Sequence, residues 1–377
     1  MRVLLLSAYD AASHRKWREG LVRHLGEHRW TVLTLPPRHF AWRTRGSALS
    51  WAHGERDVLE AGYDLVLATS MTDLASLRGM VPKLAATPTV VYFHENQFAY
   101  PDRVRRRESL HVRLTGVYTA LAADRVLFNS AWNRDSFLEG TRGLLAVMPD
   151  GVPEGVVELL GARSAVLPVP LEAAFLAAGK RSPLHGPLTL LWNHRWEHDK
   201  APERFFGALR LLAQRKVPFK VHVLGQRFRE APPSFEEARA HLGERIGQWG
   251  YVQEDEAYRN LLASCDVVVS TALHDFQGLA VLEAAAAGCL PLVPDRLAYP
   301  EFFGEGFRYP SSPDDAGRET GILAARLEAM CRDPEMTRRT PPPDLSRLSW
   351  ENQGPRYREL LEEASGVPPS PGLWRAG

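Results

Sequence analysis

Two stretches of the chain decide its fold: Leu191-Trp192-Asn193-His194-Arg195-Trp196-Glu197-His198-Asp199-Lys200 and His274-Asp275-Phe276-Gln277-Gly278-Leu279-Ala280-Val281-Leu282-Glu283-Ala284. In the first stretch, an apolar, strand-like run is followed by a cluster of charged residues. The second carries a glycine at the start of a predicted helix. A strand, a polar turn and a helix in succession are the repeating unit of α/β proteins, whose ligands bind at the carboxyl ends of the strands. The two stretches therefore predict an α/β fold with a ligand site at that edge of a sheet.

Working outward, strand-like runs alternate with helical stretches along the whole sequence. Apolar runs at 3–7, 31–35, 65–69, 89–93 and 125–129 precede a segment at 168–187 that is rich in Pro, Gly and Ala. The pattern then restarts at 188–192, 220–224, 267–270 and 290–293. Alternation of this kind favours parallel sheets. We predict two Rossmann-like, doubly wound domains that face each other across a cleft.

The predicted boundaries follow from these changes in composition. They are a domain at 1–170, a linker at 171–187, a second domain at 188–348, a C-terminal helix at 349–365 and a flexible tail at 366–377. The C-terminal helix is amphipathic and is expected to pack back on the N-terminal domain. Segments 310–321 and 333–344 are rich in Pro and Asp and are expected to be loops.

Composition narrows the class of protein. The chain has 377 residues, 45% of them hydrophobic and 24% charged, with a net charge of +1. A balance this close to neutral excludes whole-chain attraction to polyanions, so any contact with nucleic acid needs a local patch. Three cysteines without paired spacing argue against disulfides and structural zinc, and favour a reducing cytoplasm. The apolar run at 1–6 is too short for a signal peptide or a membrane span.

The first stretch carries two cations, Arg195 and Lys200, in the turn after its strand. A guanidinium grips phosphate through two hydrogen bonds, and an ammonium acts as a point charge on a neighbouring phosphate. The following helix N-terminus would add a favourable field for an anion. The alternative is that both are surface charges that pair with Glu197 and Asp199.

The second stretch places Asp275 before the predicted helix and Glu283 within it, with Gly278 between them. A carboxylate is a natural acceptor for the two hydroxyls of a ribose, and glycine permits close approach of the backbone. With the two cations, this makes a site suited to a nucleotide sugar. The alternative is a helix-capping Asp275 and a salt-bridged Glu283.

Polar residues also follow strands in the N-terminal half. His94-Glu95-Asn96-Gln97 comes directly after the run 89–93, and Ser13-His14 follows the first strand. Four polar side chains next to a buried strand are costly unless they line a site, although a satisfied polar turn is the alternative. Arg43 and Arg45 lie beside aromatic residues, and a second basic run spans 103–107. Arginine interleaved with aromatics suits RNA, but basic runs are more often solvated faces.

The two stretches resemble the donor signature of retaining GT-B glycosyltransferases, in which an Arg and a Lys follow one strand and a Glu-x7-Glu pair lies on a later helix. Here Asp275 stands at the first acidic position. The resemblance is closer to one subfamily, the tRNA-queuosine α-mannosyltransferases, and extends to about residue 310. Ala11-Ala12 stands where glycines are usual, and Gln277 replaces an aromatic. The matching stretches are Thr34-Leu35-Pro36, Phe40-Ala41-Trp42-Arg43, Ser47-Ala48, Thr69-Ser70-Met71 with Leu74, His94-Glu95-Asn96-Gln97 through Tyr100-Pro101, Phe128-Asn129-Ser130, Trp192 to Lys200, Trp249-Gly250-Tyr251, Ser270-Thr271 to Glu283, and Tyr299-Pro300-Glu301.

The resemblance implies transfer of mannose from GDP-mannose, with retention, to the cyclopentenediol of queuosine in tRNA, without a metal or a cofactor. It implies an N-terminal acceptor domain and a C-terminal donor domain, with the leaving phosphate itself deprotonating the acceptor. The implied catalytic residues are His94, Arg195, Lys200 and Asp275. The implied donor-binding residues are Arg195, Lys200, Asp275, Gly278, Leu279 and Glu283. The implied acceptor-binding residues are Ser13, His14, Glu95, Asn96, Gln97, Arg43 and Arg45.

Three other readings of the residues stay open at this point. A GT-B glycosyltransferase with another donor and a non-tRNA acceptor would fit the weak overall charge. A nucleotide-sugar epimerase would act without any acceptor. A non-catalytic tRNA-binding protein would not need Arg195, Lys200 and Glu283 together. The residues alone do not choose guanine over uracil or mannose over another hexose, and they do not indicate the oligomeric state or a membrane partner.

Overall fold

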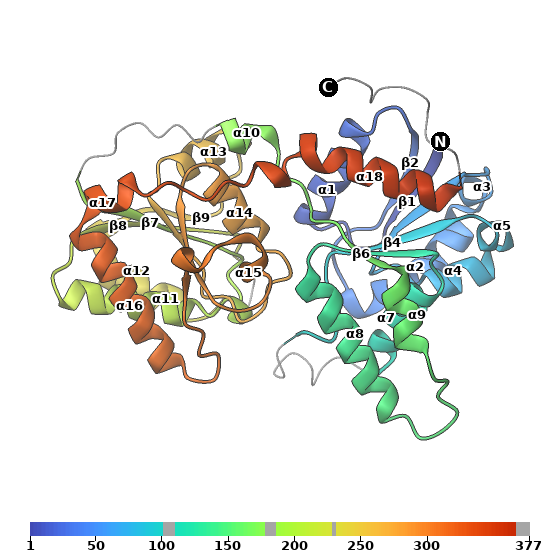
Figure 1. Ribbon diagram of the computed structural model, residues 1–377, viewed down its shortest axis with the longest axis horizontal. Helices are drawn as coiled ribbons and strands as arrows, with labels where there is room; N and C mark the ends of the chain where they lie inside the picture. Colours follow the sequence, from blue (N-terminus) through green and yellow to red (C-terminus); the bar gives the residue numbers. More distant parts are fainter. Residues whose placement is uncertain (101–109, 178–185, 228–230, 367–377) are drawn as a thin grey trace. The chain divides into compact units, whose positions relative to one another are not determined.

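The computed structural model describes residues 1–100, 110–177, 186–227 and 231–366. The chain divides into two compact units (Figure 1). Unit 1 comprises Met1–Pro170 together with the C-terminal residues from Trp350 onward, and unit 2 comprises Leu171–Ser349. Each unit contains a six-stranded parallel sheet. The α/β fold with two parallel sheets that the sequence predicts is thus confirmed.

Unit 1 has the strand order β2-β1-β3-β4-β5-β6. The central strands β3 and β4 are buried along their whole length, which explains their nearly continuous apolar runs. Because the order reverses between β1 and β3, the loops after these two strands diverge and leave room for a ligand. The strands are β1 (Arg2–Ser7), β2 (Arg29–Thr34), β3 (Leu65–Thr69), β4 (Thr89–Phe93), β5 (Arg125–Phe128) and β6 (Ser164–Val166).

Two helices of unit 1, α4 and α8, begin at residues whose side chains cap them. The Asp73 carboxylate accepts from the Ser76 amide at 3.1 Å at the start of α4, and the Ser130 hydroxyl accepts from the Asn133 amide at 3.0 Å at the start of α8. The described helices of this unit are α1 (Ala12–His24), α2 (Phe40–Gly54), α3 (Arg56–Leu59), α4 (Leu74–Met80), α5 (Pro82–Ala85), α7 (Leu110–Leu121), α8 (Ala131–Ala146), α9 (Val156–Arg163) and α18 (Trp350–Ser365).

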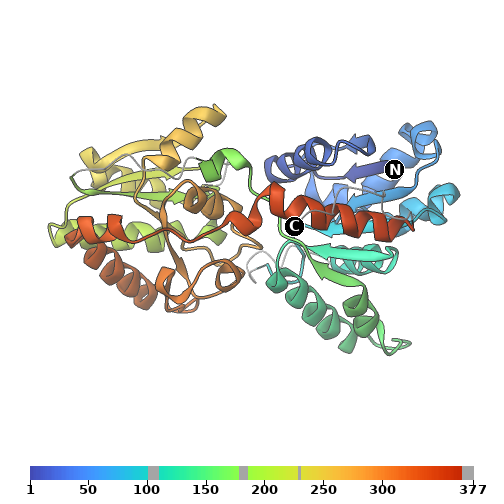
Figure 2. The same cartoon turned by 45° about the horizontal axis from the view of Figure 1, so that its top comes forward.

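The C-terminal helix α18 packs on unit 1 against α1 and β4, and Figure 2 shows it running across that unit. The indole of Trp17 donates to the Tyr357 hydroxyl at 3.0 Å, and Tyr357 donates to the carbonyl of Pro168 at 3.1 Å. A Cβ at Gly20 would lie 2.3 Å from the ring of Trp350. This glycine therefore lets α1 and α18 approach closely.

Unit 2 has the strand order β12-β11-β10-β7-β8-β9, which reverses between β7 and β10. This is the dinucleotide-binding arrangement, with its ligand crevice at the reversal. Both deciding stretches of the sequence follow these two strands. The strands are β7 (Leu188–Asn193), β8 (Phe219–Leu224), β9 (Ile246–Gly250), β10 (Val267–Val269), β11 (Leu290–Pro294) and β12 (Arg308–Tyr309).

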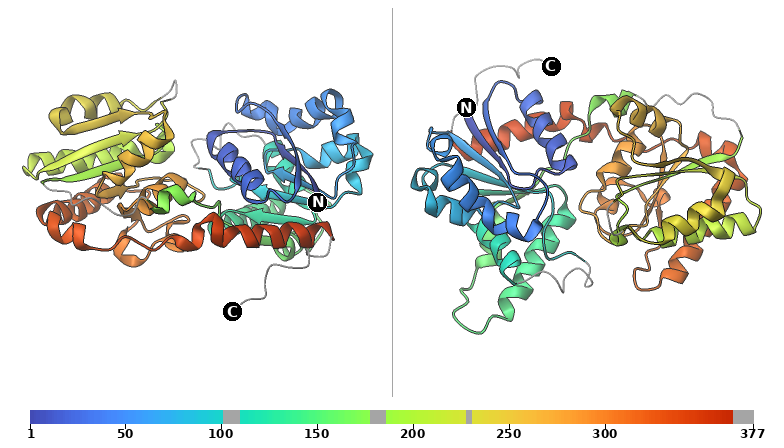
Figure 3. Two further views of the ribbon diagram at one scale, coloured as in Figure 1. Left: turned by 90° about the horizontal axis from the view of Figure 1, so that it is seen from above. Right: turned by 180° about the vertical axis from the view of Figure 1, so that it is seen from behind.

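Helices cover both faces of the unit 2 sheet (Figure 3). Helix α11 contacts α12 and α16 in one layer, and α14 contacts α10 and α13 in the other. The described helices are α10 (Ala173–Ala177), α11 (Pro202–Gln214), α12 (Ser234–Leu242), α13 (Asp255–Ala263), α14 (Leu279–Ala286), α15 (Tyr299–Phe302), α16 (Ala316–Arg332) and α17 (Pro334–Arg339), with short 3-10 turns η1 (His198–Lys200), η2 (Gly243–Arg245), η3 (Glu305–Phe307) and η4 (Ser346–Leu348).

The prediction that segments 310–321 and 333–344 are loops is wrong in part. Helix α16 begins at Ala316 within the segment 310–321, and α17 lies inside 333–344. Asp315 and Asp333 cap these helices, and Pro334 occupies the first turn of α17, where its missing N–H costs nothing. The segment 171–187 contains α10, while residues 178–185 and the tail beyond Gly366 lie outside the described residues.

Candidate functional site

In unit 2 the chain turns sharply after β7 to bring Lys200 back toward the sheet. Ala201 adopts a left-handed conformation with φ 46°, and Pro202 begins α11 immediately afterwards. Beside this turn, a Cβ at Gly225 would lie 1.7 Å from the carbonyl oxygen of His194. Only glycine permits that approach, and φ at Gly225 is 132°. The turn between β7 and α11 is thus fixed by backbone geometry.

Lys200 is buried, with 6% of its surface exposed. Its ammonium donates to the carbonyl of His274 at 2.5 Å and lies 3.3 Å from Asp199 and 3.5 Å from Asp275. Burial by itself would lower the pKa of Lys200, but the carboxylates of Asp275 and Asp199 outweigh it and raise the pKa. Lys200 is therefore a permanent cation bridging the two deciding stretches of the sequence.

Asp275 has two tasks in the structure. One carboxylate oxygen accepts from the amide of Gly278 at 2.9 Å, next to the start of α14, and the other faces Lys200. Burial would raise the pKa of Asp275, but the Lys200 charge holds it below its usual range. The pKa of Asp199 is lowered in the same way. Asp275 thus caps the start of α14 and pairs with Lys200 at the same time.

Arg195 differs from Lys200 in its surroundings. Its side chain is 54% exposed and lies 3.1 Å from the carboxylate of Glu197. Both ion pairs of the surface-charge alternative, Arg195 with Glu197 and Lys200 with Asp199, are therefore present. The guanidinium of Arg195 is thus exposed, whereas the ammonium of Lys200 is buried.

Glu283 is held on α14 by a chain of hydrogen bonds. The Tyr258 hydroxyl donates to its carboxylate at 2.8 Å, and the Asn193 amide donates to Tyr258 at 2.8 Å. Gly278 opens the helix with φ 74°, and a Cβ there would lie 2.7 Å from the ring of Tyr299. Tyr258 and Asn193 are absent from the sequence-predicted site. Asn193 carries a signal for it, being a polar residue that ends a largely apolar, buried strand.

His194 is a further residue that sequence reasoning missed. It is 5% exposed and packs edge-on against Trp192 at a centroid distance of 4.9 Å. Within the described ranges its Nε2 is buried without a hydrogen-bond partner. Burial, with a smaller contribution from the Lys200 charge, lowers the pKa of His194 to about 4. The imidazole is therefore neutral near pH 7.

In unit 1 the structure brings together two predicted residues, His14 of α1 and His94 after β4. Their rings stack at 4.1 Å with an interplanar angle of 18°. Trp17 meets His94 edge-on at 4.7 Å, and both histidines are buried. Burial and the neighbouring His14 lower the pKa of His94 well below its usual value. His94 is thus a neutral imidazole stacked on His14 and walled by aromatic rings, and Ser13 beside the pair is exposed.

Asn96 holds the turn after β4 together. Its amide nitrogen donates to Asn133 and Ser136 at 2.9 Å, and its oxygen accepts from the amides of Phe98 and Ala99 at 2.9 and 3.2 Å. The side chain is 1% exposed. The residue therefore shapes the turn, and its predicted contact with an acceptor stays a prediction.

The neighbours of Asn96 remain available for binding. Glu95 and Gln97 are partly exposed, and one oxygen of Glu95 accepts from the Tyr100 hydroxyl at 2.8 Å. They flank the rigid turn that Asn96 builds. Their predicted contact with an acceptor stays a prediction.

The two arginines predicted to contact RNA are unlike each other. Arg43 is 9% exposed, and its guanidinium donates to the carbonyl of Pro36 at 3.2 Å, so it fixes the start of α2. The predicted acceptor contact through Arg43 stays a prediction. Arg45 has a 52% exposed side chain and lies 3.2 Å from Asp73. The basic run at 103–107 lies outside the described residues.

Metal-ligating side chains and apolar helices are two further features to consider in the described residues. No group of three or more His, Cys, Asp or Glu side chains in these ranges is arranged to hold a metal ion. No helix in the described part of the chain has both the length and the apolar character needed to cross a membrane.

Solved structures define the class of protein. The chain is similar to Anabaena HepE in complex with UDP, with a TM-score of 0.67, 14% identity, and coverage of 96% of this chain and 100% of that one. It is also similar to a glycosyltransferase from Rickettsia africae, with a TM-score of 0.66, 13% identity, and coverage of 98% and 99%. The fold is therefore that of the GT-B glycosyltransferases, and the GT-B prediction is confirmed.

Sequence comparison then gives the family. Residues 2–171 match the N-terminal domain of tRNA-queuosine alpha-mannosyltransferases, and residues 180–338 match the group 1 glycosyl transferases. A tRNA-queuosine alpha-mannosyltransferase of Drosophila melanogaster is 31% identical over 375 residues, covering 96% of each chain. The chain belongs to the tRNA-queuosine alpha-mannosyltransferase family and is a glycosyltransferase.

Proposed function

We propose that this enzyme transfers mannose from GDP-mannose to the cyclopentenediol of queuosine in tRNA, with retention at the anomeric carbon. The relative in Drosophila supports the acceptor and the sugar. The single structural observation that carries the proposal is the bridge that Lys200 makes between Asp199 and Asp275 at the strand reversal of unit 2. Ligands of open α/β sheets bind at this position.

Arg195 and Lys200 stabilise the departing diphosphate in this proposal. As the bond between the anomeric carbon and the diphosphate oxygen breaks, negative charge grows on that oxygen, and fixed cations lower the energy of this transition state. Lys200 contacts three acceptors in the structure. We infer that the diphosphate replaces one of the two carboxylates around the ammonium.

The sugar and the ribose are held by α14 and its cap. Glu283, fixed by Tyr258, would accept from the two ribose hydroxyls, while Asp275 and the amides of Gly278 and Leu279 would hold mannose. Releasing Asp275 from Lys200 frees a carboxylate oxygen for a mannose hydroxyl. Cation and carboxylate then exchange partners on donor binding: the ammonium pairs with the diphosphate, and the carboxylate accepts a hydrogen bond from the sugar.

The chemical step needs no protein nucleophile. The acceptor hydroxyl attacks the anomeric carbon on the face that the diphosphate leaves, and its proton passes to the departing phosphate oxygen. Neutral His94 would donate to mannose or to the developing charge. Because Arg195 and Lys200 supply two positive charges, we propose that the reaction needs no metal ion. Its tRNA acceptor would be met in the cytoplasm.

The test is mass analysis of nucleosides from queuosine-containing tRNA incubated with purified enzyme and GDP-mannose. We expect a queuosine peak heavier by one hexose, retained when EDTA is added. The same tRNA with guanosine at the wobble position should gain nothing, and UDP-sugars should be poor donors. If the enzyme transferred hexose from UDP-glucose and not from GDP-mannose, the donor assignment would be wrong. If it converted GDP-mannose without tRNA, an epimerase would be favoured.

A further inference from the structure

Three aromatic rings of unit 1 enclose the imidazole of His94. Tyr92 precedes His94 by two residues at the end of β4, so both side chains lie on one face of the sheet. His14 and Trp17, one turn apart on the buried side of α1, cover that face. Their ring centroids and that of Tyr92 lie 4.1, 4.7 and 4.7 Å from that of His94. We call these three rings the enclosure of His94.

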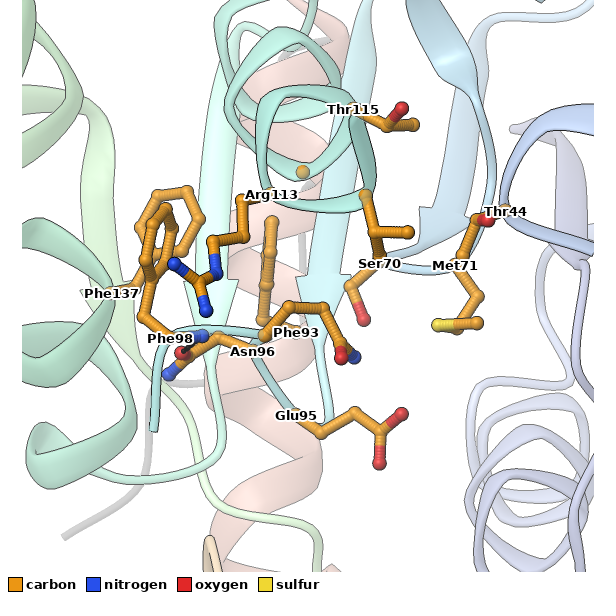
Figure 4. A pocket seen from close by; sticks show the side chains of 13 residues that line it. Thr44, Ser70, Met71, Phe93, Glu95, Asn96, Phe98, Arg113, Thr115 and Phe137 are labelled. Atoms are coloured by element: carbon orange, nitrogen blue, oxygen red, sulfur yellow. Dashed lines mark hydrogen bonds between the residues drawn. The ribbon is translucent and has the colours of Figure 1, made fainter. Parts of the chain in front are cut away.

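The backbone of His94 is fixed as well as its ring. The Asn129 amide donates to the carbonyl of His94 at 2.9 Å, and the Asn133 amide donates to that of the preceding residue at 2.9 Å. Figure 4 shows the next two residues of the turn, Glu95 and Asn96, with their side chains pointing to different sides. Within the described residues, the buried Nε2 of His94 has no hydrogen-bond partner. A polar group held in place without a partner fits a role in chemistry better than one in packing.

Tyr357 of α18 ties the enclosure together from behind. Its hydroxyl accepts from the Trp17 indole at 3.0 Å, lies 3.2 Å from the Tyr92 hydroxyl, and donates to the carbonyl of Pro168 at 3.1 Å. Tyr92 in turn donates to the carbonyl of Leu167 at 2.7 Å. Burial raises the pKa of both tyrosines above the usual value, so both hydroxyls keep their protons. One hydroxyl thus links two of the three rings to each other and to the backbone.

Resting on the function proposed above, in which His94 donates to mannose or to the developing charge, we propose that Tyr357 is a positioning residue of the transfer reaction. Its hydroxyl orders Trp17 and Tyr92, and these two rings hold the imidazole at the angle that the reaction needs. Displacement of a reacting group by about 1 Å costs on the order of a hundredfold in rate. Helix α18 then contributes to the reaction through two intervening rings.

Removal of the Tyr357 hydroxyl has a definite consequence for His94. The indole N–H of Trp17 loses its acceptor and is left buried, which side-chain movement or an entering water molecule relieves. Because burial is the main cause that lowers the pKa of His94, water beside the imidazole lets this pKa rise toward its ordinary value of 6.5. Titratable neighbours of the imidazole are His14 on α1 and Tyr92 on β4, with Tyr357 of α18 behind them. His14 stays in place in the variant, and the raised pKa of Tyr92 keeps its hydroxyl neutral.

The experiment deletes single hydroxyls in purified full-length protein. Tyr357→Phe and Tyr92→Phe remove the two hydroxyls behind the enclosure, alone and together. Tyr63→Phe is the matched control, because the Tyr63 hydroxyl also donates to a backbone carbonyl of unit 1, that of Val58 at 2.8 Å. For each protein we would measure kcat, the KM values for GDP-mannose and queuosine tRNA, the thermal midpoint, and the pKa of His94 from the NMR titration of its imidazole. His94→Gln identifies that signal by its loss.

We expect Tyr357→Phe to lower kcat about tenfold, with both KM values nearly unchanged, because positioning acts in the transition state. The pKa of His94 should rise toward 6.5. The double variant should lose no more kcat than the stronger single variant, since both hydroxyls act through one network. Tyr63→Phe should share any loss of thermal stability and keep the wild-type kcat and the wild-type pKa of His94.

Two outcomes would overturn the proposal. If Tyr357→Phe kept the wild-type kcat and the wild-type pKa of His94, at any loss of stability, the hydroxyl would only hold α18 on unit 1. If the losses in kcat of Tyr357→Phe and Tyr92→Phe multiplied in the double variant, the two hydroxyls would not act through one network. Should Tyr357→Phe fail to fold, Tyr92→Phe decides by the same two measurements. Failure of the proposed function is distinct, because wild type would then add no hexose to queuosine tRNA, while the pKa of His94 is measured in the free enzyme.

Discussion

The two units place comparable polar turns at the carboxyl ends of buried parallel strands, yet they manage burial in opposite ways. The turn after β7 buries an ammonium and pairs it with two carboxylates. The turn after β4 buries a neutral imidazole stacked on a second one. Pairing with carboxylates offsets the cost of removing the ammonium from water in the first case. In the second, the imidazole is neutral, so no charge is removed from water. A charged turn suits a diphosphate, and a neutral one suits the hydroxyls and base edges of an acceptor.

The sharpest test of the charged turn is Lys200→Met beside Arg195→Ala. Lys200→Met leaves Asp199 and Asp275 without their cation, so we expect a loss of about 3–5 kcal/mol in the free energy of unfolding. Transfer should fall by about a thousandfold, and Arg195→Ala should lose about a hundredfold with stability changed by no more than about 0.5 kcal/mol. Urea unfolding measures the stability of each variant, and turnover measures its rate of transfer. If Lys200→Met unfolded with the wild-type free energy, the contrast between a charge-paired turn after β7 and a neutral turn after β4 would be wrong.

His94→Gln tests the neutral turn. We expect kcat to fall about a hundredfold, as on removal of a positioned proton donor, with the KM for donor nearly unchanged. Since the pKa of His94 is lowered well below its usual value, the wild-type rate between pH 6 and 8 should show no titration of this residue. The exposed His53 gives the control His53→Gln, which should behave as wild type. A normal kcat in His94→Gln would remove this residue from the reaction.

Stability against pH separates the two kinds of burial. His194 has a folded pKa of about 4 against an ordinary 6.5, so the unfolded chain takes up its proton first as pH falls. Stability should therefore decrease between pH 6.5 and 4, by roughly 3 kcal/mol from this residue. Asp199 and Asp275 have lowered pKa values, and their contribution is lost only below about pH 3.8. Urea unfolding of wild type and His194→Gln at pH 7.5 and 5 measures this contribution. If the free energy of unfolding changed equally in both proteins between the two pH values, the assignment to His194 would be wrong.

The smallest expected effect concerns the chain of hydrogen bonds behind Glu283. Tyr258→Phe removes the hydroxyl that donates to Glu283 and accepts from Asn193. We expect the KM for donor to rise about fivefold to tenfold with kcat little changed, because ribose binding is the same in ground and transition states. Stability should fall by about 1 kcal/mol. The exposed Tyr251 provides the control Tyr251→Phe. A kcat effect larger than the KM effect would place Tyr258 nearer the chemistry.

The sequence anticipated that charged side chains of two distant stretches lie together in unit 2. Arg195, Lys200 and Asp275 lie in the segments after β7 and β10, and a parallel sheet brings the ends of such neighbouring strands together. It did not anticipate that the side chains of Arg43 and Asn96 bond nearby backbone and amide groups. It missed Tyr258 because that residue lies within α13, with nothing local to mark it. It misread 310–321 and 333–344 because Asp and Pro start helices as readily as they break them.

The sequence by itself determined the α/β class, the two parallel sheets and the two deciding stretches, because periodicity and turn chemistry act over a few neighbouring residues. The tertiary structure decided which charges are buried and which histidines stay neutral. These properties depend on groups far apart in the sequence, such as Lys200 and Asp275 or His14 and His94. Burial and pairing are set by what the fold places around a side chain, and no local pattern records that.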